Sequence, residues 1–362
     1  MSTDHLRQRE ALDYAISRGL MSNSDVLEHG VTVVDASRRN RNFEVRLGDG
    51  SGWFLKQGLT GTTSQTVARQ AAVEKHLRTS AGSVLSTALV PYIEYNSELN
   101  VLVSSLLKDA VPVSVHHRRI GRRPTWIGKD LAYALAELHS CVADGLPFDD
   151  GEPPWVLGVH LPTVEGLSTM SGAGLALARL IQAERHIGET LDHLRSTWEP
   201  TAVVHNDLKW DNILVYRNLE RSLSVGIIDW ELAGVGDPTW DVASVIASYL
   251  MEWVRSVPLR VDSPLDSLAE VPRVPVDTLT PAQVMFIESY LHRLLLCGRQ
   301  TDRARFLERS IQMAGARILL YAVESSLHQR ELNGEVVLMV QLASNVLRSP
   351  HDALRYLVGI AR

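Results

Sequence analysis

The sequence contains little of what redox, structural-metal or membrane chemistry requires. Only two cysteines, Cys141 and Cys297, occur among 362 residues. Neither has a Cys-x-x-Cys or Cys/His spacing, so we expect two buried thiols rather than a disulfide or a zinc site. No stretch approaches the roughly 20 consecutive apolar residues that span a bilayer, and the first residues lack the apolar segment of a secretory signal. We therefore expect a cytoplasmic protein without a membrane partner.

The chain also lacks a basic excess, since 36 lysines and arginines stand against 42 acidic residues and the formal net charge is −6. Acidic residues number 11 against 12 lysines and arginines over residues 1–108, 19 against 11 over 109–243, and 12 against 13 over 244–362. No section has the sustained basic excess that binding to duplex nucleic acid requires, so we expect no nucleic-acid partner. The acidic excess lies in the middle section, which also holds the candidate metal and acceptor carboxylates described below.

The chain is long enough for one large or two moderate domains, because 45% of its residues are hydrophobic and can bury a sizeable core. Residues 1–29 begin with an amphipathic pattern, and we expect them to form a helical extension, an appendage to the rest. Residues 30–108 alternate β-rich runs with one helical pattern over 64–79 and predict a small lobe. Residues 109–362 carry long helical patterns and predict a larger helical lobe.

The small lobe is predicted to be a five-stranded antiparallel sheet with one main helix. The expected strands occupy residues 31–34, 42–47, 53–56, 91–95 and 100–107. In the larger lobe, β structure is expected only at 202–204, 213–216 and 225–229. The expected helices there are 125–142, 163–195 with a break at 172–174, 238–255 and several from 281 onward. Flexible loops are expected at 258–280 and 144–154.

Polar residues stand between the β-rich runs of the larger lobe. The segment His205-Asn-Asp-Leu-Lys-Trp-Asp-Asn212 is bracketed by two such runs, and Asp229 follows the next one. This pattern predicts a polar loop between buried strands, with Asp229 at the end of another strand. Side chains far apart in the chain are therefore expected to converge on one small volume.

These side chains suit phosphoryl transfer. The reaction needs a group that orients the attacking hydroxyl, metal ligands on the phosphate oxygens, and a cation on the α- and β-phosphates. Asp207 is the candidate for the hydroxyl, and Asn212 and Asp229 are the candidate Mg²⁺ ligands. Lys56 would hold the phosphates of ATP, and Glu74 on the following helix would keep its ammonium group in place.

Four segments resemble the aminoglycoside phosphotransferase and choline kinase superfamily, which shares the protein-kinase fold. They are Leu135-Ala-Glu-Leu-His139, the His205 to Asn212 segment, Ile228-Asp-Trp-Glu231 and Gly236-Asp-Pro-Thr-Trp-Asp241. The resemblance spans about residues 30–250. It implies an α+β bilobal fold and an ATP- and Mg²⁺-dependent transfer of the γ-phosphoryl group to a hydroxyl acceptor.

Neighbouring residues are expected to support the polar loop. His205 should brace it by hydrogen bonds, and Asn206 stands where the family commonly has Gly, in keeping with the tolerance of Asn for a left-handed backbone. Asp237 is expected to cap the next helix and Asp241 to anchor the loop. For Glu231 two interpretations have equal weight: a further ligand or support of the metal site, or a surface salt bridge.

The nucleotide contacts are less well marked. The loop over residues 35–43 stands where the family covers the phosphates, but it contains no glycine. Phosphate contacts are expected from its backbone amides, from Ser37 and from an arginine among Arg38, Arg39 and Arg41, with a solvated hairpin tip as the alternative of equal weight. The resemblance also places the nucleotide base against the backbone of Ser104, Ser105 and Leu106.

The fold does not select the acceptor, because superfamily members phosphorylate aminoglycosides, choline, homoserine, macrolides and, in some biosynthetic clusters, peptides. Asp207 followed by Lys209 resembles Ser/Thr protein kinases, where this lysine steadies the transferring phosphoryl group. We therefore expect Ser or Thr of a precursor peptide in natural-product biosynthesis, with a partner lyase. A small-molecule acceptor is the alternative. A polycationic aminoglycoside is disfavoured, because residues 244–362 provide no acidic excess.

Two further alternatives remain open. The cluster His116-His-Arg-Arg-Ile-Gly-Arg-Arg123 is either a binding patch for an acidic leader peptide or partner or, as charge runs more often are, an exposed loop. The protein is either an active kinase or a pseudokinase scaffold that binds nucleotide without turnover. The complete set of catalytic side chains favours the enzyme, whereas the glycine-free loop favours the scaffold.

Overall fold

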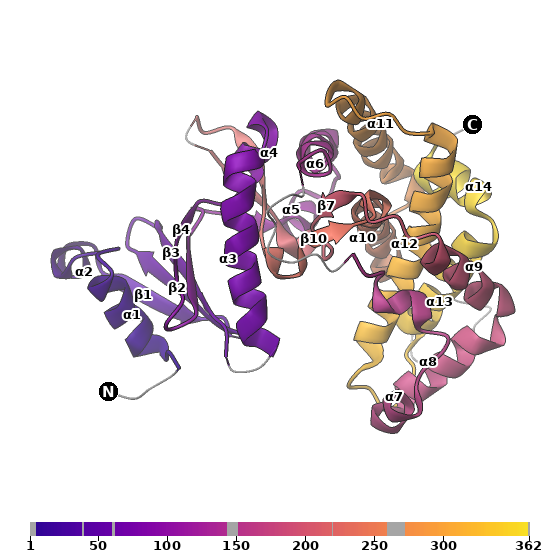
Figure 1. The fold of residues 1–362 in the computed structure, drawn as a ribbon, viewed down its shortest axis with the longest axis horizontal. Helices are drawn as coiled ribbons and strands as arrows, with labels where there is room; N and C mark the ends of the chain where they lie inside the picture. Colours follow the sequence, from indigo (N-terminus) through magenta and orange to yellow (C-terminus); the bar gives the residue numbers. More distant parts are fainter. Residues whose placement is uncertain are drawn as a thin grey trace. The chain divides into compact units, whose positions relative to one another are not determined.

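The computed structural model describes residues 5–37, 40–59, 62–142, 151–218, 220–258 and 272–360. The chain forms two compact units, each assembled from segments that are distant in sequence (Figure 1). Unit 1 comprises residues 1–120, 141–149 and 210–234, and unit 2 comprises residues 121–140, 150–209 and 235–362. Flexible loops were predicted at 144–154 and 258–280, and most of each lies outside the described ranges, which omit residues 143–150 and 259–271 as well as Arg38 and Arg39.

Unit 1 contains a five-stranded antiparallel sheet in the order β1-β2-β3-β5-β4. Its strands are β1 (Val31–Asp35), β2 (Arg41–Leu47), β3 (Gly52–Gln57), β4 (Tyr92–Asn96) and β5 (Val101–Ser105). Gly50, in the turn between β2 and β3, has a φ of 83°, which lies in the left-handed region that favours glycine. All five strands predicted from the sequence are confirmed.

The first helix, α1 (Gln8–Ser17), belongs to the core of this sheet and is not the appendage that the sequence predicted. It buries Ala11, Tyr14 and Ala15 in one cluster with Phe43 and other core residues of β2, β3 and β5. Amphipathic spacing indicates that a helix buries one face, but it does not indicate which surface that face covers. The correction therefore concerns packing rather than secondary structure.

Three more helices belong to unit 1: α2 (Asn23–His29), α3 (Thr62–Ser80) and α4 (Ser83–Ala88). The predicted helix α3 packs on the sheet, where Val67 and Ala71 bury together with Leu102 of β5. The sequence did not predict α2 or α4. Helices of six or seven residues show too little periodicity to be recognised, and α2 depends on a capping box between Ser22 and Asp25.

A second, three-stranded antiparallel sheet in unit 1 has the order β6-β8-β9. Its strands are β6 (Val111–Pro112), β8 (Ile213–Arg217) and β9 (Leu223–Ile227). The helix α5 (Val113–Ile120) follows β6 and contains most of the cluster that was predicted as a charged loop or binding patch. His117 is 1% exposed and packs edge-to-face on Trp210, with 5.8 Å between the ring centroids. The exposed-loop interpretation is therefore wrong for His117.

Unit 2 is mainly helical. Its long helices are α6 (Thr125–Leu138), α10 (Pro238–Ser256), α11 (Thr280–Leu296), α12 (Arg303–Ser326) and α13 (Gly334–Arg348). The helix α6 packs along α11, and α12 packs against both α10 and α13 (Figure 1). The predicted helix over 163–195 breaks at two places, giving α7 (Val164–Thr169), α8 (Gly172–Ala183) and α9 (Arg185–Ser196). A short helix, α14 (Pro350–Ala353), follows α13, and β7 (Ala202–Val204) pairs with β10 (Gly234–Gly236).

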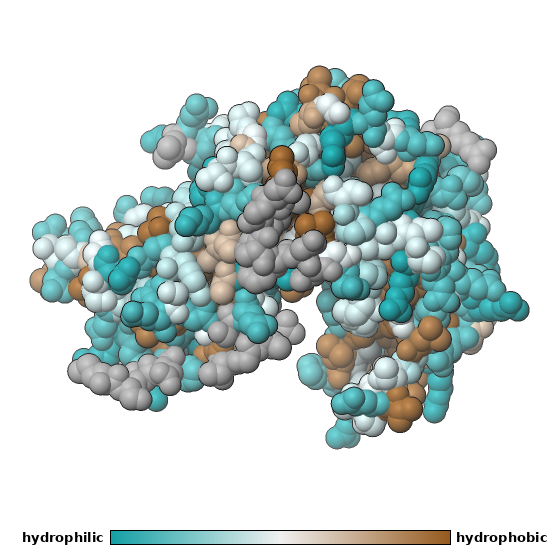
Figure 2. All heavy atoms as spheres, viewed as in Figure 1, coloured by the Kyte–Doolittle hydropathy of each residue, from teal (hydrophilic) through white to brown (hydrophobic). Residues whose placement is uncertain are grey.

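Cys141 and Cys297 are thiols that are partly exposed, rather than buried as predicted. Across the described ranges, every helix is too short or too polar to cross a bilayer. On the face drawn in Figure 2, apolar side chains are scattered among hydrophilic ones. Scattered apolar residues of this kind are normal on protein surfaces.

Candidate active site

Lys56 on β3 holds its ammonium group among polar side chains of unit 1. Its Nζ donates to Oδ1 of Asp229 at 2.5 Å and to Oε2 of Glu231 at 2.7 Å. A third bond, of 2.9 Å, reaches Oε1 of Gln70 on α3. Lys56 is 5% exposed, so its charge depends on these partners for compensation. The prediction that Lys56 and Asp229 come together is confirmed.

The turn after β9 aims both carboxylates at Lys56. Asp229 has φ 66° and ψ 55°, a left-handed conformation that costs a non-glycine residue about 1–2 kcal/mol. Trp230, between the two acids, is 1% exposed, and α3 packs against this turn. A strained residue held in place by a buried aromatic neighbour is typical of a functional position.

The sequence predicted that Glu74 holds the ammonium group of Lys56 directly, but Gln70 stands between these two residues. Its Nε2 donates to Oε1 of Glu74 at 2.8 Å. Burial raises the pKa of Glu74 to about 7, although Gln70 and nearby cations oppose the shift. A carboxyl that is partly protonated at neutral pH compensates an ammonium poorly. Asp229 and Glu231 therefore take the part that was assigned to Glu74.

The predicted metal ligands Asn212 and Asp229 lie at the same end of the hairpin formed by β8 and β9. Ile213 pairs with Ile227, and the N–H of Ile228 donates to the carbonyl of Asn212 at 3.0 Å. Asn212 therefore lies opposite the residue that precedes Asp229. The hairpin register, rather than any local signal, brings an amide and a carboxylate together here.

This donor set fits a magnesium ion. Mg²⁺ takes oxygen ligands and is usually bound by one or two carboxylates together with waters and phosphates. Asp229, Asn212 and the neighbouring Glu231 provide such oxygens, and two carboxylates against one ammonium leave the cluster with excess negative charge. Within the described ranges, no group of three or more His, Cys, Asp or Glu side chains forms a metal cage. Phosphates and waters would therefore have to complete the coordination.

Asn40 belongs to the same cluster but was not predicted. Its Nδ2 donates to Oε2 of Glu231 at 3.1 Å, and it is 4% exposed. The loop between β1 and β2 therefore contacts Glu231 through an asparagine. Ser37, which was predicted to contact phosphate, accepts from the N–H of Asn42 at 3.1 Å within its own hairpin. Because Glu231 binds a buried lysine, the surface-salt-bridge interpretation of this residue is wrong.

The segment predicted to contact the nucleotide base comprises the last two residues of β5 and the residue that follows the strand. The N–H of Ser105 donates to the carbonyl of Pro91, and the N–H of Leu106 donates to the carbonyl of Gly52, both at 2.8 Å. Ser104 pairs with Phe54 within the sheet. These bonds fix the backbone conformation of the segment, and its contact with the nucleotide base stays a prediction.

Asp207 and Lys209 lie in unit 2, where a third residue joins them. Lys209 donates from Nζ to Oδ2 of Asp207 at 2.7 Å, and Arg317 of α12 donates from Nη2 to Oδ1 at 2.8 Å. Burial opposes ionisation of Asp207, but Arg317 and then Lys209 outweigh it, so the pKa of Asp207 lies below its usual value. Asp207 is therefore ionised at neutral pH and held between two cations.

The loop that carries Asp207 is anchored by a buried carboxylate. Asp241 of α10 is fully buried and accepts from the N–H groups of His205 at 2.7 Å and Asn206 at 3.0 Å. His139 Nε2 lies 3.2 Å from Asp241. Asn206 has a φ of 66°, and Nδ1 of His205 accepts from the N–H of Asp207 at 3.3 Å. Three predictions are therefore confirmed: Asp241 anchors the loop, His205 braces it, and Asn206 has a left-handed backbone.

Asp237 caps α10, as its position before Pro238 predicted. Its Oδ1 accepts from the N–H of Thr239 at 2.9 Å. Arg309 of α12 donates to Oδ2 of Asp237 from both Nε, at 2.9 Å, and Nη2, at 2.7 Å. The cap thereby links α10 to α12.

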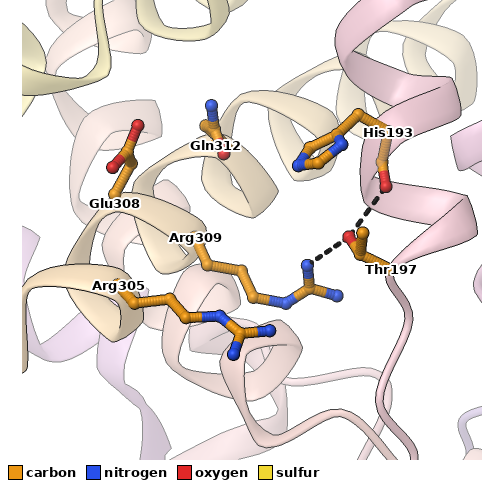
Figure 3. Close-up of a pocket in the computed structure, with 6 residues that line it drawn as sticks. All are labelled: His193, Thr197, Arg305, Glu308, Arg309 and Gln312. Carbon is orange, nitrogen blue, oxygen red and sulfur yellow. Dashed lines mark hydrogen bonds between the residues drawn. The ribbon is translucent and has the colours of Figure 1, made fainter. Parts of the chain in front are cut away.

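A pocket of about 280 Å³ opens between α9 and α12 (Figure 3). It is lined by His193, Thr197, Arg305, Glu308, Arg309 and Gln312. Arg309 donates to Oγ1 of Thr197 at 2.7 Å and is paired with Asp237, while Arg305 is paired with Glu199. The protein itself therefore neutralises both arginines. A neighbouring pocket of about 520 Å³ shares them, and the residues that line either pocket include none of the predicted catalytic or nucleotide-binding residues.

Arg317 is the main residue that sequence reasoning missed in unit 2. It lies 110 positions after Asp207, in the run Gly315-Ala-Arg-Ile-Leu-Leu320. A lone arginine in an apolar stretch of helix was the available signal, because such residues are rarely buried unless they are paired. The identity of its partner could not be read from the helix.

Residues 30–264 of the chain match the phosphotransferase enzyme family. Viomycin phosphotransferase from Streptomyces vinaceus is 39% identical over 70 residues, which are 19% of this chain and 23% of that protein. The match thus spans about a quarter of the relative's length.

Two solved structures are similar over nearly the whole chain. An ethanolamine kinase from Plasmodium vivax has a TM-score of 0.56 at 12% identity, covering 96% of this chain and 97% of that one. The GDP complex of an aminoglycoside 2'-phosphotransferase-IIIa variant has a TM-score of 0.53 at 11% identity, covering 96% and 99%. At such identities the similarity shows the fold alone. The predicted α+β kinase-like fold, with a five-stranded sheet and a larger helical part, is confirmed.

Proposed function

Because the chain belongs to the phosphotransferase enzyme family, whose kinases use an alcohol as acceptor, we propose that it transfers the γ-phosphoryl group of ATP, with Mg²⁺, to a hydroxyl of a small molecule. Its two structural relatives are named for ethanolamine and aminoglycoside acceptors, and both are small molecules. These names favour a small-molecule acceptor, the alternative in the sequence analysis, over the precursor peptide. The peptide acceptor, with its partner lyase, stays as the second candidate because Lys209 contacts Asp207 as it would in a Ser/Thr kinase.

The Lys56 cluster is the observation that carries this proposal. A lysine that is 5% exposed and is bound by two carboxylates is poorly explained by stability, since buried ion pairs add little net stability. It is well explained as a phosphate-binding group. We infer that Lys56 binds the α- and β-phosphates and that Asp229 and Asn212 bind Mg²⁺. When bound, the metal would neutralise the charge that develops on the phosphate oxygens.

Asp207 is assigned to the acceptor. Its pKa lies below the usual value, so it is a weak base and acts mainly by orienting the hydroxyl, taking the proton late in the transfer. Lys209 has a side chain that is 33% exposed and reaches Asp207 through a flexible stem. It is the group assigned to the transferring phosphoryl oxygens.

The proposal is tested by incubating the protein with Mg²⁺, ATP labelled in its γ-phosphate and two acceptor panels. The first contains amino alcohols, aminoglycosides, macrolides and viomycin, and the second contains Ser- and Thr-bearing peptides. We expect labelled product from the first panel, lost in Asp207→Asn. Asp211→Asn is the matched control, because Asp211 lies on the same loop and is exposed. Label on peptides alone would support the second candidate, and a protein that fails to bind ATP would refute both.

A further inference from the structure

Arg317 is almost completely enclosed within unit 2. It is 2% exposed and lies in the middle of α12. Its Nη2 donates to Oδ1 of Asp207 at 2.8 Å and reaches the carbonyl of Leu208 at 3.4 Å. Because a buried charge is strongly unfavourable unless it is paired, Arg317 and Asp207 depend on one another.

Two aromatic rings hold the guanidinium group in place. Its carbon lies 5.6 Å from the ring centre of Trp240 and 5.2 Å from that of Tyr321, within the range of cation–π attraction. Trp240 is itself fixed, since it is 1% exposed and its Nε1 donates to the carbonyl of Asn206 at 3.1 Å. Arg317, Trp240 and the loop that carries Asp207 therefore form one connected network.

Arg317 and Lys209 differ in mobility, although both bind Asp207. The side chain of Lys209 is 33% exposed, whereas that of Arg317 is 2% exposed. A guanidinium group offers a planar set of donors that is pre-organised for a carboxylate, while an ammonium on a four-carbon stem can change partners. One oxygen of Asp207 thus has a fixed partner and the other has an exchangeable one.

We propose that Arg317 is a positioning residue for phosphoryl transfer: it holds Oδ1 of Asp207 throughout the cycle, so that Oδ2 is presented to the acceptor hydroxyl when Lys209 moves to the transferring phosphoryl group. This inference rests on the proposed role of Asp207. Arg317 makes no contact with substrate in this account and acts through the orientation and ionisation of one carboxylate.

The pH dependence of the reaction separates this role from a purely structural one. Arg317 stays protonated at every working pH, and its charge keeps Asp207 ionised. Among the described residues, Lys209 and His205 contact Asp207, Glu324 acts on both Lys209 and Arg317, and Tyr321 acts on Arg317. All four are retained when Arg317 alone is replaced, so a shift of the profile reports the loss of the guanidinium charge.

The experiment measures kcat, KM for ATP and the pH profile of kcat in wild type, Arg317→Met and Arg317→Lys. For Arg317→Met we expect kcat to fall about 10- to 100-fold with KM for ATP unchanged. The acidic limb of the pH profile of kcat should move to higher pH. Activity requires ionised Asp207, and the pKa of Asp207 rises when the guanidinium is lost. Arg317→Lys retains a cation, so it should restore the position of the limb and part of kcat.

Arg309→Met is the matched control. Arg309 lies on the same helix, its side chain is 11% exposed, and it is paired with Asp237. The Arg309→Met variant should lower the melting temperature as Arg317→Met does, but it should not shift the acidic limb of the pH profile. An unshifted limb in Arg317→Met, with kcat no lower than in Arg309→Met, would overturn the inference.

Arg317→Lys decides the matter if Arg317→Met does not fold. The lysine keeps the charge but loses the planar geometry, so we expect a lower kcat at an unshifted limb, and a wild-type kcat would refute positioning. Failure of the proposed function looks different, because Asp207→Asn would then transfer phosphate like wild type. An inactive Asp207→Asn beside a fully active Arg317→Met refutes only the role of Arg317.

Discussion

The Lys56 cluster of unit 1 and the Asp207 cluster of unit 2 have opposite compositions. Lys56 is one cation bound by two carboxylates, Asp229 and Glu231. Asp207 is one carboxylate bound by two cations, Lys209 and Arg317. The first cluster has a spare negative charge, which favours a metal ion, and the second has a spare positive charge, which keeps its carboxylate ionised. We infer that the excess charge distinguishes the proposed metal-nucleotide site from the proposed acceptor site, where residue types alone do not.

The two clusters share one design feature. Each contains a buried cation, Lys56 at 5% exposure and Arg317 at 2%, and a more exposed partner. The side chain of Asp229 is 32% exposed and that of Lys209 is 33% exposed. We infer that the buried member fixes the geometry and that the exposed member exchanges its partner when substrate binds.

The comparison is tested most severely by Asp229→Asn, which removes the charge from the proposed metal ligand. We expect the transfer rate at saturating ATP and Mg²⁺ to fall on the order of a thousandfold or more, because the metal supplies several kcal/mol of transition-state stabilisation. Initial rates of ADP release measure this loss. Asp49→Asn, in an exposed turn of the same unit, serves as its control. A rate within about tenfold of wild type would contradict the metal assignment.

Asp207→Asn sharpens the comparison by separating turnover from binding. We expect kcat to fall about 10²- to 10⁴-fold, because hydroxyl orientation and proton acceptance are lost. The KM for ATP should change little, because the proposed nucleotide ligands lie in unit 1. Steady-state kinetics with varied ATP measure both quantities. A large rise in KM for ATP with an unchanged kcat would reverse the roles assigned to the two clusters.

Glu231→Gln produces a smaller effect within the first cluster. It leaves Lys56 with one carboxylate and keeps an acceptor for Asn40. Residues that support metal and phosphate ligands typically contribute about 10- to 100-fold to affinity, and we expect a decrease at the lower end of that range. Calorimetric titration with ATP and Mg²⁺ measures the dissociation constant. Unchanged affinity would show that the second carboxylate does not support the site.

Glu74→Gln affects stability rather than catalysis. The pKa of Glu74 is raised from 4.5 to about 7, so its stabilising contribution is complete below pH 4.5 and is lost as the pH rises through 7. Gln resembles the protonated form and does not titrate. At pH 8 the free energy of unfolding of the variant should therefore exceed that of wild type by up to about a few kcal/mol. The difference should be smaller at pH 5. Urea denaturation at both pH values measures this, and an equal difference at both would contradict the raised pKa.

Local signals account for what the sequence predicted correctly. Asp237 before Pro238 indicated a helix cap, and alternating β-rich runs indicated the five strands of the sheet. The order of Lys56, Asp207 and Asp229 along the family pattern indicated the site residues, which were predicted to converge on one small volume. Each of these inferences depends on neighbouring residues or on a motif with fixed spacing.

Long-range contacts account for what was missed. Arg317 reaches Asp207 across 110 positions, and Asn40 reaches Glu231 across 191. Such pairs leave no periodic trace in the sequence. Gln70 and Glu74 have side chains of equal length one turn apart on α3, so the placement of that helix decides which of them reaches Lys56. The burial of α1 against the sheet was likewise a matter of packing, which the helix's own pattern does not specify.

Calorimetric titration of ATP in the presence and absence of Mg²⁺ tests most directly whether the Lys56 cluster is the metal-nucleotide site. Wild type and Asp207→Asn should bind ATP more tightly when Mg²⁺ is present. In Asp229→Asn that dependence on Mg²⁺ should disappear. If Asp229→Asn keeps the wild-type dependence on Mg²⁺, the metal is bound elsewhere and the contrast between the two clusters has been misassigned.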